Sequence, residues 1–130
     1  MNRRKVITTA ALAAMGSGAS GAAVPATKSP VVRVSFGRYP ADKEAAIAEI
    51  MNYSGKPVEQ AIQKLPGLIS YYSGIDREAH TIVNVSLWKD VESAKQMDSL
   101  QAMIDLGKVV VELGVKFERP IPNCTTLWSV

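Results

Sequence analysis

The segment 81–88 carries the residues whose types and spacing are best suited to chemistry. Its odd positions Val83, Val85 and Leu87 are apolar, whereas its even positions mix apolar, amide, hydroxyl and indole side chains: Ile82, Asn84, Ser86 and Trp88. Successive side chains of a β-strand point to opposite faces, so the even positions share one face. We therefore expect this face of the strand to line a partly polar cavity.

Asn84 and Trp88 are neutral hydrogen-bond donors placed four residues apart. At roughly 3.3 Å per residue they lie about 13 Å apart along a strand. At this distance they cannot both bind the same ligand atom, but they can line a pocket for fused aromatic rings. An amide and an indole N–H can stabilise the anion of a phenol-like substrate, and such an anion can itself reduce O₂. This chemistry needs neither a metal nor a flavin, so we expect no cofactor.

A structural interpretation of the same two residues also stands. Trp88 can close the core where a strand meets a helix, and Asn84 can be a hydrogen-bonded amide at the end of a sheet. An unpaired buried amide costs about 1–3 kcal/mol, so Asn84 must find partners or face a wet cavity. Ser86 shares the face of Asn84 and is a candidate substrate-binding residue. If residues 76–80 form the turn of a regular hairpin, Tyr72 sits opposite Asn84 and is a second candidate.

His80 and Cys124 are the only histidine and the only cysteine of the chain. His80 shares the parity of Asn84 but lies in or beside the turn, so it is either solvated or a general base. Cys124 is either a small buried hydrophobe or, in an oxidising compartment, a bridge between subunits. One residue of each kind excludes a disulfide scaffold and a zinc site built from several His and Cys ligands.

The charge balance argues against binding to nucleic acid. Four of the 15 basic residues lie within residues 1–30, so residues 31–130 carry 11 basic residues against 12 acidic ones. A nucleic-acid interface needs a basic surplus to displace counterions from phosphates.

The length of 130 residues allows one domain.

Residues 1–26 have the order of an export signal. A basic start precedes a weakly apolar run of ten residues and then small residues, with cleavage expected after Ala26. Asn2–Thr8 resembles the twin-arginine motif, which implies a periplasmic or secreted protein of bacterial origin. A membrane span needs about 20 apolar residues, so we expect no stable membrane anchor after cleavage. The alternatives are an ordinary secretory signal and a disordered tail.

The sequence pattern predicts one α+β domain over residues 31–130, after a linker at 27–30. Its strands and helices follow in the order β-α-β-β-α-β. This is the ferredoxin-like arrangement with an antiparallel four-stranded sheet. We expect strands at 31–38, 68–75, 81–88 and 124–130, a first helix from Asp42 that is interrupted at 55–57, and a second helix over 91–114 with Asp90 as N-cap. Strands that are apolar on both faces in so short a domain predict a homodimer, in which a second copy covers the sheet.

Three segments resemble the antibiotic biosynthesis monooxygenase family of dimeric α+β barrel proteins. Leu65–Tyr72 resembles the family's Pro-Gly helix end and second strand, and Val85–Ala94 resembles its third strand, which ends in Trp before the second helix. Arg119–Ile121, leading into Leu127–Trp128, resembles the approach to its fourth strand. The resemblance covers residues 31–130 and implies a dimeric α+β barrel.

The resemblance also implies an activity. Members that oxygenate polycyclic aromatic substrates without a cofactor use an Asn and a Trp four residues apart on the third strand, a pattern that Asn84 and Trp88 match. An active-site Tyr that some members carry early in the second helix has no counterpart in 91–98, and the ligating His of the haem-degrading branch is absent from 91–114. We therefore expect a cofactor-independent monooxygenase acting on an aromatic or quinone-like small molecule. The alternative is a non-catalytic exported dimer that binds such a molecule.

Overall fold

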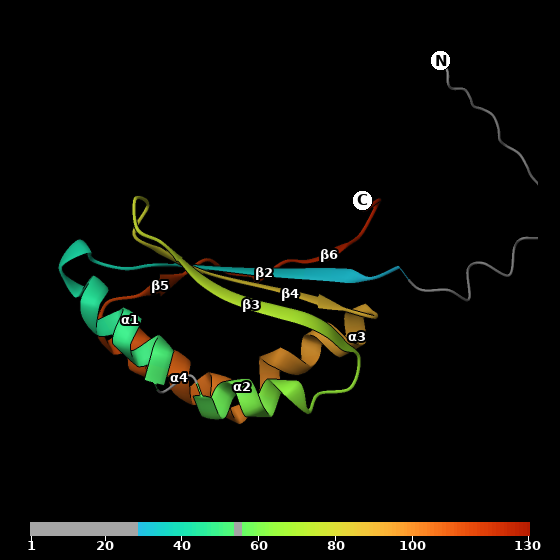
Figure 1. Ribbon diagram of the computed structural model, residues 1–130, viewed down its shortest axis with the longest axis horizontal. Helices are drawn as coiled ribbons and strands as arrows, with labels where there is room; N and C mark the ends of the chain where they lie inside the picture. Colours follow the sequence, from blue (N-terminus) through green and yellow to red (C-terminus); the bar gives the residue numbers. More distant parts are fainter. Residues whose placement is uncertain (1–28, 54–55) are drawn as a thin grey trace, which may run out of the picture.

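The computed structural model describes residues 29–53 and 56–130, which form an antiparallel sheet with a layer of helices on one of its faces (Figure 1). The elements are β2 (Val31–Arg38), η3 (Ala41–Lys43), α1 (Glu44–Tyr53), α2 (Lys56–Gln63), β3 (Leu68–Asp76), β4 (Thr81–Trp88), α3 (Val91–Lys95), η4 (Gln96–Ser99), α4 (Gln101–Glu112), β5 (Lys116–Phe117) and β6 (Asn123–Thr125). The α+β class and the ferredoxin-like element order are confirmed. The expected export signal lies outside the described residues.

The sheet has the strand order β3-β4-β2-β5, and β6 also pairs with β2. β5 pairs with one end of β2 and β6 with the other; β6 contains the start of the expected fourth strand, whereas no strand was expected at the position of β5. Pro120 and Pro122 lie between β5 and β6 and carry no N–H for a strand ladder. The expected strand 124–130 is therefore wrong beyond Thr125, and Trp128 is 78% exposed.

The first helical segment is divided as the sequence predicted. α1 ends at Tyr53 and α2 begins at Lys56, with Pro57 in its first turn, where a missing N–H is tolerated. The connection to β3 passes through Gly67, whose φ of +86° suits glycine. A Cβ at this position would lie 2.2 Å from Ser93 Oγ, so glycine is also required by the close approach of α3.

The second helical segment differs from the sequence prediction of one continuous helix. The Asp90 N-cap is confirmed, because Ser93 N donates to Asp90 Oδ1 at 2.8 Å. After α3 and η4, however, Leu100 adopts an extended conformation with ψ of 112°, and α4 starts afresh at Gln101. This break lets the chain turn back beneath the sheet (Figure 1). None of the helices within residues 29–53 and 56–130 combines the length and the apolar composition that a membrane span requires.

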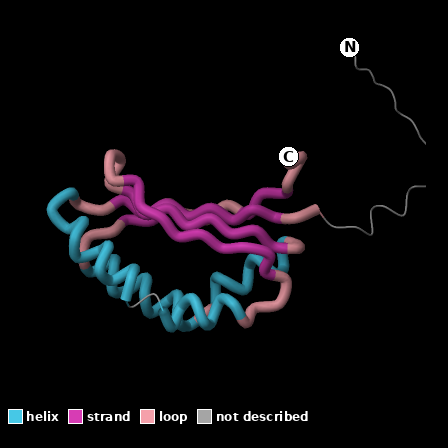
Figure 2. The backbone as a smooth tube through the Cα atoms, in the orientation of Figure 1, coloured by secondary structure: helices cyan, strands magenta, loops and turns pink. Residues whose placement is uncertain are grey.

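The helices cover only one face of the sheet (Figure 2). The hydrophobic core takes its residues from both layers and lies between them. One group of buried core residues consists of Val31, Val58, Ile62, Trp88, Ala94, Met97 and Leu106. A second group consists of Tyr39, Ile47, Ile82, Val110 and Val115. The opposite face of the sheet has no covering layer within the described part of the chain.

Candidate functional site

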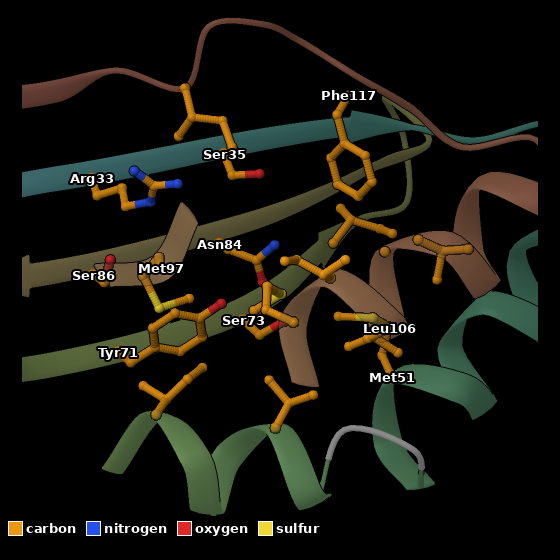
Figure 3. A pocket seen from close by; sticks show the side chains of 18 of the residues that line it. Arg33, Ser35, Met51, Tyr71, Ser73, Asn84, Ser86, Met97, Leu106 and Phe117 are labelled. Atoms are coloured by element: carbon orange, nitrogen blue, oxygen red, sulfur yellow. The ribbon is translucent and has the colours of Figure 1, made fainter. Parts of the chain in front are cut away.

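A cavity of about 430 Å³ lies between the sheet and the helices, beside the two core groups. Its floor is the inner face of the sheet, and its opposite wall is formed largely by apolar side chains of the helices (Figure 3). Met51, Val58, Ile62, Met97, Met103 and Leu106 are among the wall residues. A cavity of this size and lining suits a small apolar molecule with a polar edge.

The polar groups of the floor are brought together by the pairing of β2 and β3 with the central strand β4. Two rows cross the sheet: Ser35, Asn84 and Ser73, then Arg33, Ser86 and Tyr71. All six residues line the cavity. Alternate positions of each strand therefore place hydroxyl, amide, phenol and guanidinium groups on one surface.

Asn84 lies at the centre of this floor, as the sequence predicted. Its side chain points into the cavity (Figure 3). Its Oδ1 is buried and has no hydrogen-bond partner among the described residues. An unsatisfied buried amide oxygen costs about 1–3 kcal/mol of stability. A ligand that donates a hydrogen bond to Asn84 Oδ1 would remove this cost.

Tyr71 contributes a phenol to the cavity that the sequence analysis missed. Burial raises the pKa of Tyr71 to about 12, against the opposing effect of the nearby Arg33 charge. At neutral pH the phenol is therefore protonated and can donate a hydrogen bond to an oxygen of a ligand.

Tyr72, expected opposite Asn84, lies on the other face of the sheet and is 68% exposed. The strand β3 extends one residue further than expected, to Asp76, so the hairpin turn has four residues in place of five. A shift of one residue exchanges the two faces of a strand. The placement of Tyr72 in the cavity is therefore wrong, and Tyr71 occupies that face instead.

Trp88 is not among the residues that line the cavity. Its side chain is fully buried in the core, and its Nε1–H donates to Ser86 Oγ at 2.8 Å. The expectation that Trp88 lines the pocket is therefore wrong, and the structural interpretation of this residue holds. Ser86, expected in the pocket, does line it and is 3% exposed.

His80 lies at the hairpin turn, outside the cavity, with a left-handed φ of 51°. Its ring packs edge-on against Tyr39, and its Nδ1 lies 3.9 Å from Glu44 Oε1. Glu44 also accepts a hydrogen bond from the Tyr39 hydroxyl at 2.8 Å and forms an ion pair with Arg77. These contacts connect the hairpin to α1, whereas the floor polar groups belong to a cavity that His80 does not line.

Glu44 gives this cluster a pH dependence. The hydrogen bond from Tyr39, followed by that from Arg77, lowers the pKa of Glu44 below its ordinary value of 4.5. A lowered carboxyl pKa stabilises the fold above the ordinary pKa, and this contribution is lost as the pH falls through the folded-state value. We expect Glu44→Gln to lower the free energy of unfolding more at pH 7 than at pH 3, measured by urea denaturation. Glu49→Gln, an exposed change on the same helix, is the control, and an equal loss at both pH values would contradict the assignment.

Cys124 is exposed on β6, so the first of its two alternatives, a small buried hydrophobe, is wrong. A disulfide bridge between subunits stays a prediction.

Within the described ranges, no group of three or more His, Cys, Asp or Glu side chains is placed to hold a metal ion.

Solved structures of oxygenases share this fold. SnoaB from Streptomyces nogalater, a cofactor-independent oxygenase, is 12% identical with a TM-score of 0.57, and the match covers 78% of this chain and 97% of SnoaB. A monooxygenase from the ActVA-Orf6 gene of Streptomyces coelicolor, solved with nanaomycin D, is 14% identical with a TM-score of 0.56, covering 81% and 93%. A protein from Deinococcus radiodurans assigned to antibiotic biosynthesis monooxygenases is 13% identical with a TM-score of 0.61, covering 77% and 95%.

These similarities establish the fold and leave the activity to be argued from the site. No protein-family model and no curated protein sequence matches this chain.

Proposed function

We propose that the protein is a cofactor-independent monooxygenase acting on an aromatic or quinone-like small molecule. The observation that carries this proposal is the Asn84 side chain, which lines a cavity of about 430 Å³ and whose buried Oδ1 has no partner among the described residues. A polar floor opposite an apolar wall suits a flat ring system that carries its oxygens on one edge. The fold shared with the Streptomyces nogalater oxygenase supports the same class of reaction.

The Asn84 amide suits both states of a phenolic substrate. Its oxygen accepts the hydrogen of a phenol, and its NH₂ group donates to the oxyanion that forms when the phenol is deprotonated. In the overall reaction, a ring C–H opposite the hydroxyl becomes a carbonyl, and the hydroxyl carbon becomes the second carbonyl of a quinone. One atom of O₂ enters the ring and the other leaves as water. The substrate supplies all of the electrons, so no external reductant is needed.

Oxygen uptake with 1-naphthol tests the proposal. We expect the protein to accelerate O₂ consumption above the rate in buffer, with one atom of ¹⁸O₂ incorporated into the 1,4-naphthoquinone formed. Gly107→Leu is the blocking variant, because Gly107 lines the cavity and a Cβ there meets no atom within 4 Å. This change should abolish uptake while the circular dichroism spectrum is retained. Uptake at the buffer rate by the unaltered protein would contradict the proposal.

The second candidate is an exported binding or accessory protein that uses the same cavity without turnover. The observation that favours it is the absence of histidine among the described residues of the cavity wall, which leaves the substrate without the commonest general base. Saturable binding of 1-naphthol without oxygen uptake would select this function.

A second copy of the chain is proposed to cover the open face of the sheet. This face carries apolar side chains from the three longest strands: Val32, Val34, Phe36, Tyr72, Val83, Val85 and Leu87. Phe36 is 37% and Tyr72 is 68% exposed in the single chain. Apolar surface of this extent is unfavourable in water, and a closed two-fold dimer buries it.

Val85→Asp tests the dimer. Val85 lies between Val34 and Tyr72 in the strand register, so a charge there would stand at the centre of the proposed interface. We expect light scattering at micromolar concentration to give twice the mass of one chain for the unaltered protein and the mass of one chain for the variant. Val109→Asp, at an exposed position on α4, should leave the dimer intact. A monomeric unaltered protein would contradict this assembly.

A further inference from the structure

Arg33 is a buried cation on the floor of the cavity. Its side chain is 8% exposed, although arginine is rarely buried unless it is paired. Nη2 donates to Asp98 Oδ1 at 2.7 Å, and Nη1 donates to Asn123 Oδ1 at 3.0 Å. These two bonds engage two of the five N–H groups of the guanidinium.

The charge of Arg33 is only partly balanced within the cavity. The Asp98 side chain is 58% exposed on η4, so water solvates and screens its carboxylate. The guanidinium is largely sheltered from water, so its charge acts in a medium of lower dielectric constant than bulk water, where its interaction with an anion is stronger. Figure 3 shows the Arg33 side chain reaching over the floor beside Ser86 and Tyr71.

We propose that Arg33 selects an aromatic substrate that carries a carboxylate, which the remaining N–H groups of the guanidinium bind while the oxidisable ring lies against Asn84. This inference rests on the proposed function and names the substrate class of the same site. A guanidinium is a planar fork that matches the two oxygens of a carboxylate, whereas a neutral hydroxyl engages only part of it.

The spacing of the floor residues fits such a ligand. Arg33 pairs across the sheet with Ser86, and Ser86 is two residues from Asn84 on β4, about 7 Å along a strand. Two fused rings span a similar length. A carboxylate at Arg33 therefore leaves the far ring at Asn84, with the apolar helical wall over its other face.

Calorimetric titration with 2-naphthoate and 2-naphthamide tests the inference, because the two probes have nearly the same shape and differ in charge. We expect the unaltered protein to bind the acid at least about tenfold more tightly than the amide, as charge-assisted hydrogen bonds imply. Arg33→Gln should remove this preference and leave the affinity for the amide within about threefold. Arg38→Gln is the matched control, since it removes one positive charge from the same strand at an exposed position.

Two further variants separate recognition from a structural role of Arg33. Arg33→Lys keeps the charge but not the fork, so the preference should fall without vanishing. Asp98→Asn removes the carboxylate that competes for the guanidinium, so the affinity for 2-naphthoate should rise while that for 2-naphthamide stays constant. A residue that only fastens η4 to the sheet would show neither pattern.

The outcomes distinguish this inference from the proposed function. Equal binding of acid and amide by the unaltered protein, or an unchanged preference in a folded Arg33→Gln variant, would overturn the inference alone. Binding of neither probe would overturn the aromatic-binding cavity and the inference together. A clear preference for the acid without oxygen uptake would uphold Arg33 as the selecting residue and overturn the monooxygenase.

Discussion

Replacing Trp88 with alanine will lower the free energy of unfolding by about 3–5 kcal/mol, the range for removing a buried aromatic side chain. Trp88 has no exposed surface and packs in the core group with Val31, Ala94 and Leu106. The change also removes the N–H that bonds to Ser86 Oγ at 2.8 Å. Chemical denaturation followed by circular dichroism measures the loss.

Trp88→Phe separates the structural role of this residue from a catalytic one. The phenyl ring retains part of the packing but leaves the buried Ser86 hydroxyl without its donor, a cost of about 1–3 kcal/mol. Because the indole lies outside the cavity lining, we expect oxygen uptake by the folded variant to stay within about threefold of the unaltered rate. A large loss of oxygen uptake without a loss of stability would show that Trp88 takes part in catalysis and contradict its structural assignment.

Asn84→Ala will slow oxygen uptake with 1-naphthol by about 10²-fold, the effect of removing one preorganised donor to an oxyanion. The fold should be retained or slightly stabilised, because Asn84 Oδ1 has no protein partner to lose among the described residues. The initial rate measured with an oxygen electrode and the denaturation midpoint give the two readouts. Asn52→Ala, the same substitution on the exposed part of α1, is the control and should leave both unchanged.

A large destabilisation without a change in rate would contradict this role. It would mean that Asn84 bonds within the protein and that the amide serves the sheet.

Strand β4 illustrates how much of the site can be predicted from the sequence. Its bounds match the expected segment, and the alternation of Asn84 and Ser86 with apolar residues correctly predicted a polar cavity face. The partner strand could not be placed equally well. Whether Tyr71 or Tyr72 faces the cavity depends on one residue more or less in the turn, and nothing in the local pattern fixes that number.

The sequence of 31–38 contains a pattern that predicts Arg33 on the cavity face. In 31–38 the odd positions hold Arg33 and Ser35, the same mixture of polar types that marked the cavity face of β4. The helix break at Leu100 had no comparable signal, because the apolar spacing continues through it. Such a break depends on tertiary structure, and the hydrogen bond from Arg33 to Asp98 connects η4, the segment before the break, to the sheet.

The place where an aromatic molecule binds tests the central claim most directly. A crystal structure of the protein grown anaerobically with 1-naphthol should show the rings between the sheet and α4, with the hydroxyl about 3 Å from the Asn84 side-chain amide. Rings bound on the open face of the sheet beside Tyr72, or an Asn84 amide hydrogen bonded to protein groups with no space beside it, would contradict the account.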